Sequence, residues 1–251
     1  MKNRKNKTKR KPLLFKFVKS ILSLSYKKYK LLGLENIPAE PSIIVGNHVQ
    51  ATGPISAEIC FPYNKKIWCI GQMMNYKTAP PYAFDDFYKY KPKCLHWFYK
   101  IIAFLISPIL VYVNKHADTI AVYKDGRGLS TFKNSAQSLK DGNHLIIFPE
   151  CHTPFNEIVN DFQTNFVNVA KLHYKTTNVQ ISFVPMYIAP KIKTIVYGKP
   201  IKFDANINME EQQQIICTHL KTEITKMAKE LPIHTVVPYA NVPKKQYPKS
   251  K

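Results

Sequence analysis

The chain has 251 residues, 45% of them hydrophobic, which suits one compact domain or one domain with a small appendage. Lys and Arg total 37 against 16 Asp and Glu, and this net charge of +21 favours polyanionic partners such as anionic lipid, phosphorylated substrates or nucleic acid. Five cysteines with no CxxC pair argue against a disulfide framework or a zinc site, so we expect a reducing compartment and no bound metal.

The positive charge is concentrated at the N-terminus, where the first 30 residues contain 12 Lys or Arg and no acidic residue. From Leu13 onward, apolar residues recur at helical spacing with lysines between them, which predicts a basic amphipathic helix. Such a helix suits attachment to a membrane surface that contains anionic lipid, and packing on the domain with solvated lysines explains the pattern equally well. We therefore divide the chain into a basic tail with this helix (1–35), a main domain (36–235) and a basic C-terminal tail (236–251).

The longest apolar run, Ile101–Val113, has 13 residues and contains Pro108, so it is shorter than the ~20 residues that span a bilayer. It lies in an aromatic and Met-rich region, residues 72–112, which suits a core, the wall of an acyl-chain tunnel or contact with a membrane. A helix over about 94–106 is predicted there. The N-terminus shows no secretory signal pattern. We expect a peripheral protein at the cytoplasmic face of a membrane.

The rest of the main domain alternates predicted strands with predicted helices. Short runs rich in β-branched residues predict strands at 41–46, 66–70, 119–123, 144–148, 181–188 and 194–197. Helical periodicity predicts helices at 130–141, 161–174 and 208–230, the last with a capping pair in Asn208 and Glu211. This alternation predicts an α/β fold with a mostly parallel central sheet flanked by helices.

In such sheets, functional sites gather at the carboxyl ends of strands. That rule selects Asn47-His48, Lys124 to Arg127, and Glu150 to Thr153, because each group follows a predicted strand. In this order they resemble the sequence blocks of the glycerolipid acyltransferase (PlsC-like) superfamily. The third block, Phe148-Pro149-Glu150, is followed by Cys151-His152-Thr153, and a later strand carries the family's Val-Pro as Val184-Pro185. The turn Gly198-Lys199-Pro200 also resembles the family's downstream pattern.

The resemblance implies a glycerol-3-phosphate acyltransferase-like fold and a role for each of these groups. His48 would be the general base, which its ordinary pKa near neutrality allows, and Glu150 would lie in the cleft. Asn47 would bind substrate, and Lys124 and Arg127 would be the phosphate-binding pair. His152 and Thr153 are further substrate-binding candidates because they closely follow Glu150. The reaction would move a fatty acyl group from acyl-CoA or acyl carrier protein to the hydroxyl of a lysophospholipid or related acceptor, without a cofactor.

Two departures from the family pattern bear on activity. The family has Asp five residues after the histidine, where this chain has Gly53, and it has Gly-Thr-Arg after the glutamate, where this chain has Cys151-His152-Thr153. Four acidic residues remain as candidates to support His48: Glu58, Asp85, Asp86 and Glu150. The alternative reading is a catalytically impaired member that binds lipid or an acyl carrier. We expect no nucleic-acid partner, because charge alone supports one and no recognition motif does.

Overall fold

The computed structural model describes residues 11–26, 29–123 and 125–251. An eight-stranded sheet forms its centre, in the order β1-β9-β8-β2-β5-β3-β4, with β10 also paired to β8. The strands are β1 (Lys30–Leu32), β2 (Ile43–Gly46), β3 (Lys65–Ile70), β4 (Thr119–Val122), β5 (His144–Ile147), β8 (Ser182–Ala189), β9 (Thr194–Tyr197) and β10 (Ile201–Lys202). Only β9 and β10 pair antiparallel to their neighbour β8 among these described strands. The predicted α/β fold with a mostly parallel central sheet is confirmed.

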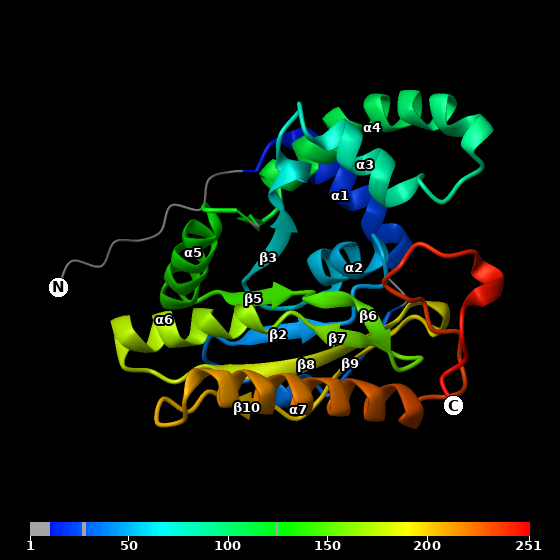
Figure 1. Cartoon of the computed structure of the whole chain (residues 1–251). Helices are drawn as coiled ribbons and strands as arrows, with labels where there is room; N and C mark the ends of the chain where they lie inside the picture. The colour runs from blue at the N-terminus through cyan, green and yellow to red at the C-terminus, as the bar shows by residue number, and fades with distance from the viewer. Residues whose placement is uncertain (1–10, 27–28, 124) are drawn as a thin grey trace.

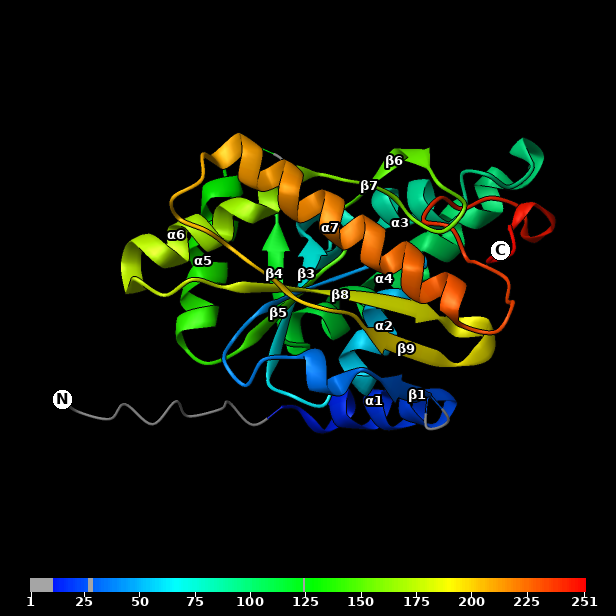
Figure 2. The same cartoon turned by 90° about the horizontal axis from the view of Figure 1, so that it is seen from below.

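Helices cover both faces of this sheet (Figure 1). They are α1 (Leu13–Tyr26), α2 (Thr52–Cys60), α3 (Ala79–Phe87), α4 (His96–His116), α5 (Gly128–Lys140), α6 (Asn168–Thr177) and α7 (Met209–Glu230). Figure 2 shows α7 running along β8, with α1 on the opposite side of the sheet next to α2. A separate two-stranded hairpin, β6 (Glu150–Phe155) and β7 (Asn160–Phe162), follows β5 directly.

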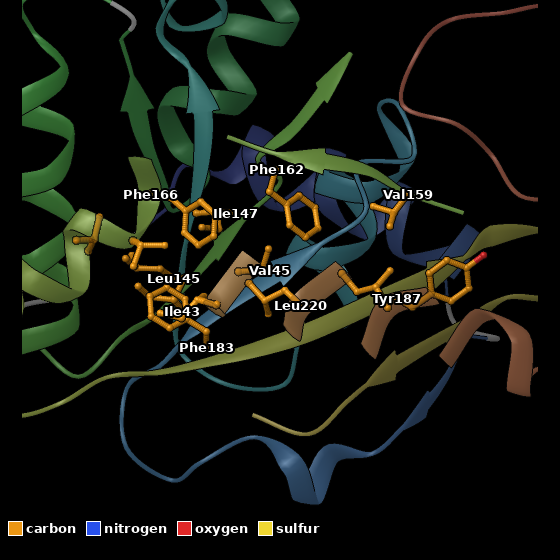
Figure 3. Close-up of a cluster of buried hydrophobic side chains, with 14 of the residues drawn as sticks. Ile43, Val45, Leu145, Ile147, Val159, Phe162, Phe166, Phe183, Tyr187 and Leu220 are labelled. Atoms are coloured by element: carbon orange, nitrogen blue, oxygen red, sulfur yellow. The ribbon is translucent and has the colours of Figure 1, made fainter. Parts of the chain in front are cut away.

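The core has two parts because successive residues of a strand point to opposite faces. On one face Ile43, Val45 and Leu145 pack with Leu220 of α7, as Figure 3 shows. On the other face Ile44 and Ile146 pack with residues such as Ala57 of α2. Both faces of β2 and β5 are therefore buried, which explains why their sequences are continuous apolar runs rather than alternating ones.

Two predicted helices differ from the observed ones. The first turn of the helix predicted at 161–174 is instead β7, because residues 160–162 pair with β6, and the helix begins only at Asn168. The helix predicted at 94–106 continues to His116 and passes through Pro108. Pro108 has no amide hydrogen, so α4 lacks the hydrogen bond to the carbonyl of Phe104 at this point.

The α4 helix and its preceding turn form a longer apolar element than the predicted helix 94–106. The stretch Lys93–His116 is long and apolar enough to cross a membrane, judged by length and composition only. Little of it is buried in the protein, and it runs along the upper edge of the molecule in Figure 1. The α1 helix meets it at one end, where the rings of Phe15 and His116 lie 6.4 Å apart between centroids.

The C-terminal segment, residues 232–251, which includes the predicted basic tail 236–251, folds back onto the domain. His234 is buried and pairs with the hydroxyl of Tyr187 at 2.8 Å and with the hydroxyl of Ser250 at 2.9 Å. The amide of Val236 donates to the carbonyl of Pro248 at 2.9 Å, which closes the segment into a loop. In Figure 1 this loop (red) lies beside β6, at the edge of the sheet toward which β2 and β5 point.

Candidate active site

His48 lies at the carboxyl end of β2, between the neighbouring strands β8 and β5. The side chain of Asn47 holds this strand end in place: its amide donates to the carbonyl of Ile188 at 3.1 Å, and its oxygen accepts from the amide of Ile188 at 2.7 Å. Asn47 is 3% exposed, so it extends the pairing of β2 with β8 and does not point a free polar group at a ligand.

The loop after His48 has an unusual backbone. Val49 and Gln50 both have positive φ, at 49° and 55°, which is uncommon for residues other than glycine. This turn brings the start of α2 back against His48, so that a Cβ built on Gly53 would lie 2.0 Å from the carbonyl oxygen of His48. The position where the family pattern has aspartate therefore has no room for any side chain.

Glu150 binds the backbone of this loop rather than the imidazole ring. It is 3% exposed, and one carboxyl oxygen accepts from the amide of His48 at 2.6 Å while the other accepts from the amide of Asn160 at 3.0 Å. Burial raises the pKa of Glu150 to about 7, although the two amides act in the opposite direction. Glu150 thus joins the His48 loop to the β6–β7 hairpin.

The imidazole of His48 contacts two aromatic rings. Phe148 lies 5.6 Å away and Tyr239 5.1 Å away, measured between ring centroids, and both pairs are edge-to-face. Burial lowers the pKa of His48 to about 4, and the nearby backbone of Gln50 offsets only part of the shift. The ring is therefore neutral at physiological pH. Its Nδ1 atom is buried and has no hydrogen-bond partner of good geometry within the described residues.

The acidic residues that were candidates to support His48 are placed elsewhere. Glu58 forms ion pairs with Lys19 at 2.5 Å and Lys65 at 3.7 Å. Asp85 and Asp86 line a cavity of about 320 Å³ together with His152 and Tyr239. Burial raises the pKa of Asp86, and the charge of His152 opposes that shift, so these two side chains lie close to each other.

This cavity adjoins the His48 site through Tyr239, whose ring contacts both His48 and His152. Its charged lining consists of Asp85, Asp86 and Lys89, and Lys89 is 3.7 Å from Asp85. A phosphate would meet two carboxylates there, so the cavity suits an uncharged or cationic part of a ligand. Thr153 is exposed on β6 next to His152. A larger hollow of about 520 Å³ on α7 shares none of these residues.

Of the predicted phosphate-binding pair, the structure describes Arg127 alone. Lys124 lies outside the described residues. Arg127 follows β4, which β5 and β3 separate from β2 in the sheet. Its guanidinium pairs with Asp125 at 2.6 Å and lies 3.9 Å from the centre of the Tyr123 ring. The bond to Arg127 holds the pKa of Asp125 well below its usual range, at about 2.

Sequence reasoning missed the contribution of the C-terminal segment. Tyr239 of this segment contacts the His48 ring. In addition, the side-chain amide of Gln50 donates to the hydroxyl of Tyr247 at 2.9 Å and to the carbonyl of Ala240 at 3.3 Å. Asn241 donates to the backbone carbonyl of Asp86. Nothing in the sequence of this segment resembles an active-site block. Across the described ranges, no group of three or more His, Cys, Asp or Glu side chains is arranged to hold a metal ion.

Comparisons with known proteins give a distant structural likeness only. No protein-family model matches the sequence, and no curated protein matches it. Four chains of solved structures match, and one is described as the crystal structure of the 1-acyl-sn-glycerophosphate (LPA) acyltransferase PlsC from Thermotoga maritima. It is 14% identical, the match covers 85% of this chain and 81% of that chain, and the TM-score is 0.47. A likeness of this extent carries nothing about substrate or catalysis.

Proposed function

We propose that this protein is an O-acyltransferase that moves a fatty acyl group from acyl-CoA or acyl carrier protein to the hydroxyl of a lysophospholipid or related acceptor. The observation that carries the proposal is the meeting of the first and third sequence blocks across neighbouring strands. His48 follows β2, Glu150 follows β5, and a hydrogen bond of 2.6 Å joins them. The resemblance of these blocks to glycerolipid acyltransferases supplies the reaction class.

The chemistry requires a base at the acceptor hydroxyl. His48, neutral at physiological pH, takes the hydroxyl proton as the oxygen attacks the thioester carbonyl carbon. The tetrahedral intermediate collapses, the carbon–sulfur bond breaks, and the imidazolium returns the proton to the departing thiolate. Glu150 acts by fixing the backbone of the His48 loop. The hydrogen bonds from the amides of His48 and Asn160 to its two carboxyl oxygens support this role.

A membrane surface is the proposed location of the reaction, at its cytoplasmic face. Two helices support it, because they present large apolar side chains to the outside. These exposed side chains are Leu13, Leu14, Phe17, Ile21 and Leu24 on α1 and Trp97, Phe98, Ile101, Phe104, Leu105 and Ile109 on α4. Exposed apolar faces of this extent are typical of interaction sites, and the lysines of the N-terminal region add attraction to anionic lipid.

The alternative is a non-catalytic relative that binds lipid or an acyl carrier. One observation favours it: the His48 ring has no carboxylate on Nδ1 among the described residues, and Tyr239 covers one side of the ring. An aspartate that orients the histidine contributes about 10⁴-fold to rate in serine proteases, so its absence bears on activity.

One experiment separates the two functions. Radiolabelled acyl groups on acyl-CoA and on acyl carrier protein are offered with an extract of native lipids to the wild type, to His48→Ala and to His219→Ala. His219 is a matched control on α7, where its ring hydrogen-bonds to the carbonyl of Lys199 at 2.9 Å. We expect label to enter lipid with the wild type and the control but not with His48→Ala. If none of the three proteins transfers label but all still bind vesicles, the result would favour the non-catalytic function of binding lipid or an acyl carrier.

A further inference from the structure

The His48 ring is held without a carboxylate. In the described parts of the chain, its Nδ1 atom has no hydrogen-bond partner of good geometry, although the ring interacts with the backbone of Gln50, and both carboxyl oxygens of Glu150 are occupied by backbone amides. Gly53 has no space for a side chain. Because a general base must be oriented to act, contacts other than a carboxylate have to fix the ring.

Packing against two aromatic rings fixes the imidazole in the absence of a carboxylate. Phe148 meets the imidazole edge-to-face at an interplanar angle of 70°, and Tyr239 does so at 65°. Edge-to-face contact is the favoured arrangement of such rings, and it restricts rotation as well as adding contact. Phe148 comes from the strand end next to His48, whereas Tyr239 comes from the far end of the chain.

The segment that carries Tyr239 is anchored on both sides of this residue. Before it, His234 is fixed in the core by Tyr187. After it, Asn241 donates to the carbonyl of Asp86. The side chain of Gln50, in the His48 loop itself, reaches Ala240 and Tyr247. The Tyr239 ring is thus placed by contacts to three different parts of the domain, and one of them is the loop that it covers.

We propose that Tyr239 is a positioning residue for His48, holding the imidazole against Phe148 in place of the carboxylate for which position 53 has no room. This inference rests on the proposed function for its kinetic consequence, but the holding of the ring is a property of the folded protein alone. The Tyr239 ring also screens His48 from water, so it contributes to the burial that lowers the pKa of His48. The charged or titratable groups around this contact include Glu150, Asp86, Cys151, His152 and Tyr82, with Asp85, Lys89 and Tyr90 in the adjoining cavity.

The test compares Tyr239→Phe and Tyr239→Ala with the wild type. Tyr63→Ala is the matched control, because the Tyr63 ring also packs against a histidine. Its centroid lies 5.7 Å from that of His144, which is on β5 and far in the sequence from Tyr239. Two readouts are used: the titration of the His48 ring by NMR on protein labelled at histidine, with His48→Ala to assign the signal, and kcat and KM for acyl transfer. Melting temperatures show that each variant is folded.

We expect Tyr239→Ala to raise the pKa of His48 toward its ordinary value, because the ring becomes hydrated. We also expect it to reduce kcat by roughly 10- to 100-fold while KM changes little, as misorientation of a base does. Tyr239→Phe should keep both properties within about twofold, because it keeps the ring contact. The control should leave the His48 titration unchanged.

Two results would overturn the proposal. One is a His48 titration in Tyr239→Ala that is the same as in the wild type. The other is a loss of kcat in Tyr239→Phe as large as in Tyr239→Ala, which would make the phenol hydroxyl the functional group. The titration needs no turnover, so a protein without transferase activity would still show whether Tyr239 holds the ring, and the failure of one proposal is distinguishable from that of the other.

Discussion

Restoring the family's aspartate at position 53 should harm this protein rather than improve it. The Cβ of any residue there would lie 2.0 Å from the carbonyl oxygen and 2.8 Å from the carbonyl carbon of His48. Both are backbone atoms, so the clash is not relieved by turning a side chain. Relief requires the loop of Asn47 to Gln50 to move, and that loop is bound through Asn47 to β8 and through Glu150 to the β6–β7 hairpin.

The magnitude follows from two contributions. Overpacking a buried site costs about 1–3 kcal/mol, and a polar group buried without partners costs about 1–3 kcal/mol more. We therefore expect Gly53→Asp to lower the free energy of unfolding by roughly 2–6 kcal/mol. Gly53→Ala should lower it by about 1–3 kcal/mol, because it introduces the overpacking alone. Gly126→Asp is the control, because a Cβ built on Gly126 meets no atom within 4 Å.

Urea unfolding followed by circular dichroism measures these differences, and the acyl-transfer assay shows what happens to the site. Gly53→Asp should unfold at lower urea and transfer no faster than the wild type, while Gly126→Asp should resemble the wild type in both assays. A Gly53→Asp protein with unchanged stability and faster transfer would refute the reasoning, because the loop would then accept the carboxylate that the structure excludes.

Three further predictions concern the ionisation of Glu150, the binding of α4 to a membrane and the role of Arg127. The pKa of Glu150 is about 7 in the folded protein against 4.5 for the free side chain, so the folded state binds the extra proton between these pH values and loses stability as pH rises through them. Glu150→Gln is the reference, because it does not titrate at this position and leaves one backbone amide without an acceptor. Relative to this variant, the free energy of unfolding of the wild type in urea titrations should fall by at most about 3 kcal/mol from pH 4.5 to 7. A difference that stays constant with pH would mean that the carboxylate is already ionised. Phe104→Asp, at a 66% exposed position on α4, should reduce flotation with anionic vesicles several-fold at an unchanged melting temperature, and equal flotation would remove α4 from the membrane contact. Arg127→Ala should leave KM unchanged for both a phosphate-bearing and a zwitterionic lysolipid, because β5 and β3 separate β4 from β2 and the guanidinium pairs with Asp125, whereas a several-fold rise for the phosphate-bearing lysolipid alone would show that Arg127 contacts phosphate.

The sheet and the position of His48 could be predicted from sequence because local patterns determine them. The run of residues 43–46 is apolar and β-branched, it is buried on both faces as β2, and the polar pair that follows lies at its carboxyl end. The boundaries of α7 were also predictable, because Asn208 accepts from the amide of Glu211 in the capping arrangement that their spacing indicates. These features depend on neighbouring residues only.

The environment of His48 could not be predicted because it depends on contacts between distant segments. Sequence shows that aspartate is missing at position 53, but not that Val49 and Gln50 adopt left-handed backbone conformations, which no residue pattern there indicates. Likewise, β7 forms at residues 160–162 because β6 is beside it, against the helical periodicity of the segment. Tyr239 lies in a segment that reads as a tail, and only its packing places it on the imidazole.

The burial of His48 has a consequence for the pH dependence of the proposed reaction. The acid limb of kcat/KM reports the pKa of the base in the free enzyme, and for His48 that pKa is about 4 rather than 6.5. Below its own pKa of about 7, Glu150 is mostly uncharged, so it supplies little negative charge that would raise the pKa of the ring. We expect kcat/KM to stay flat from pH 7 down to about 5 and to fall only near pH 4, in buffers where the protein stays folded. A fall centred near pH 6.5 would mean that the ring is hydrated in the free enzyme, and therefore that Tyr239 does not cover it there.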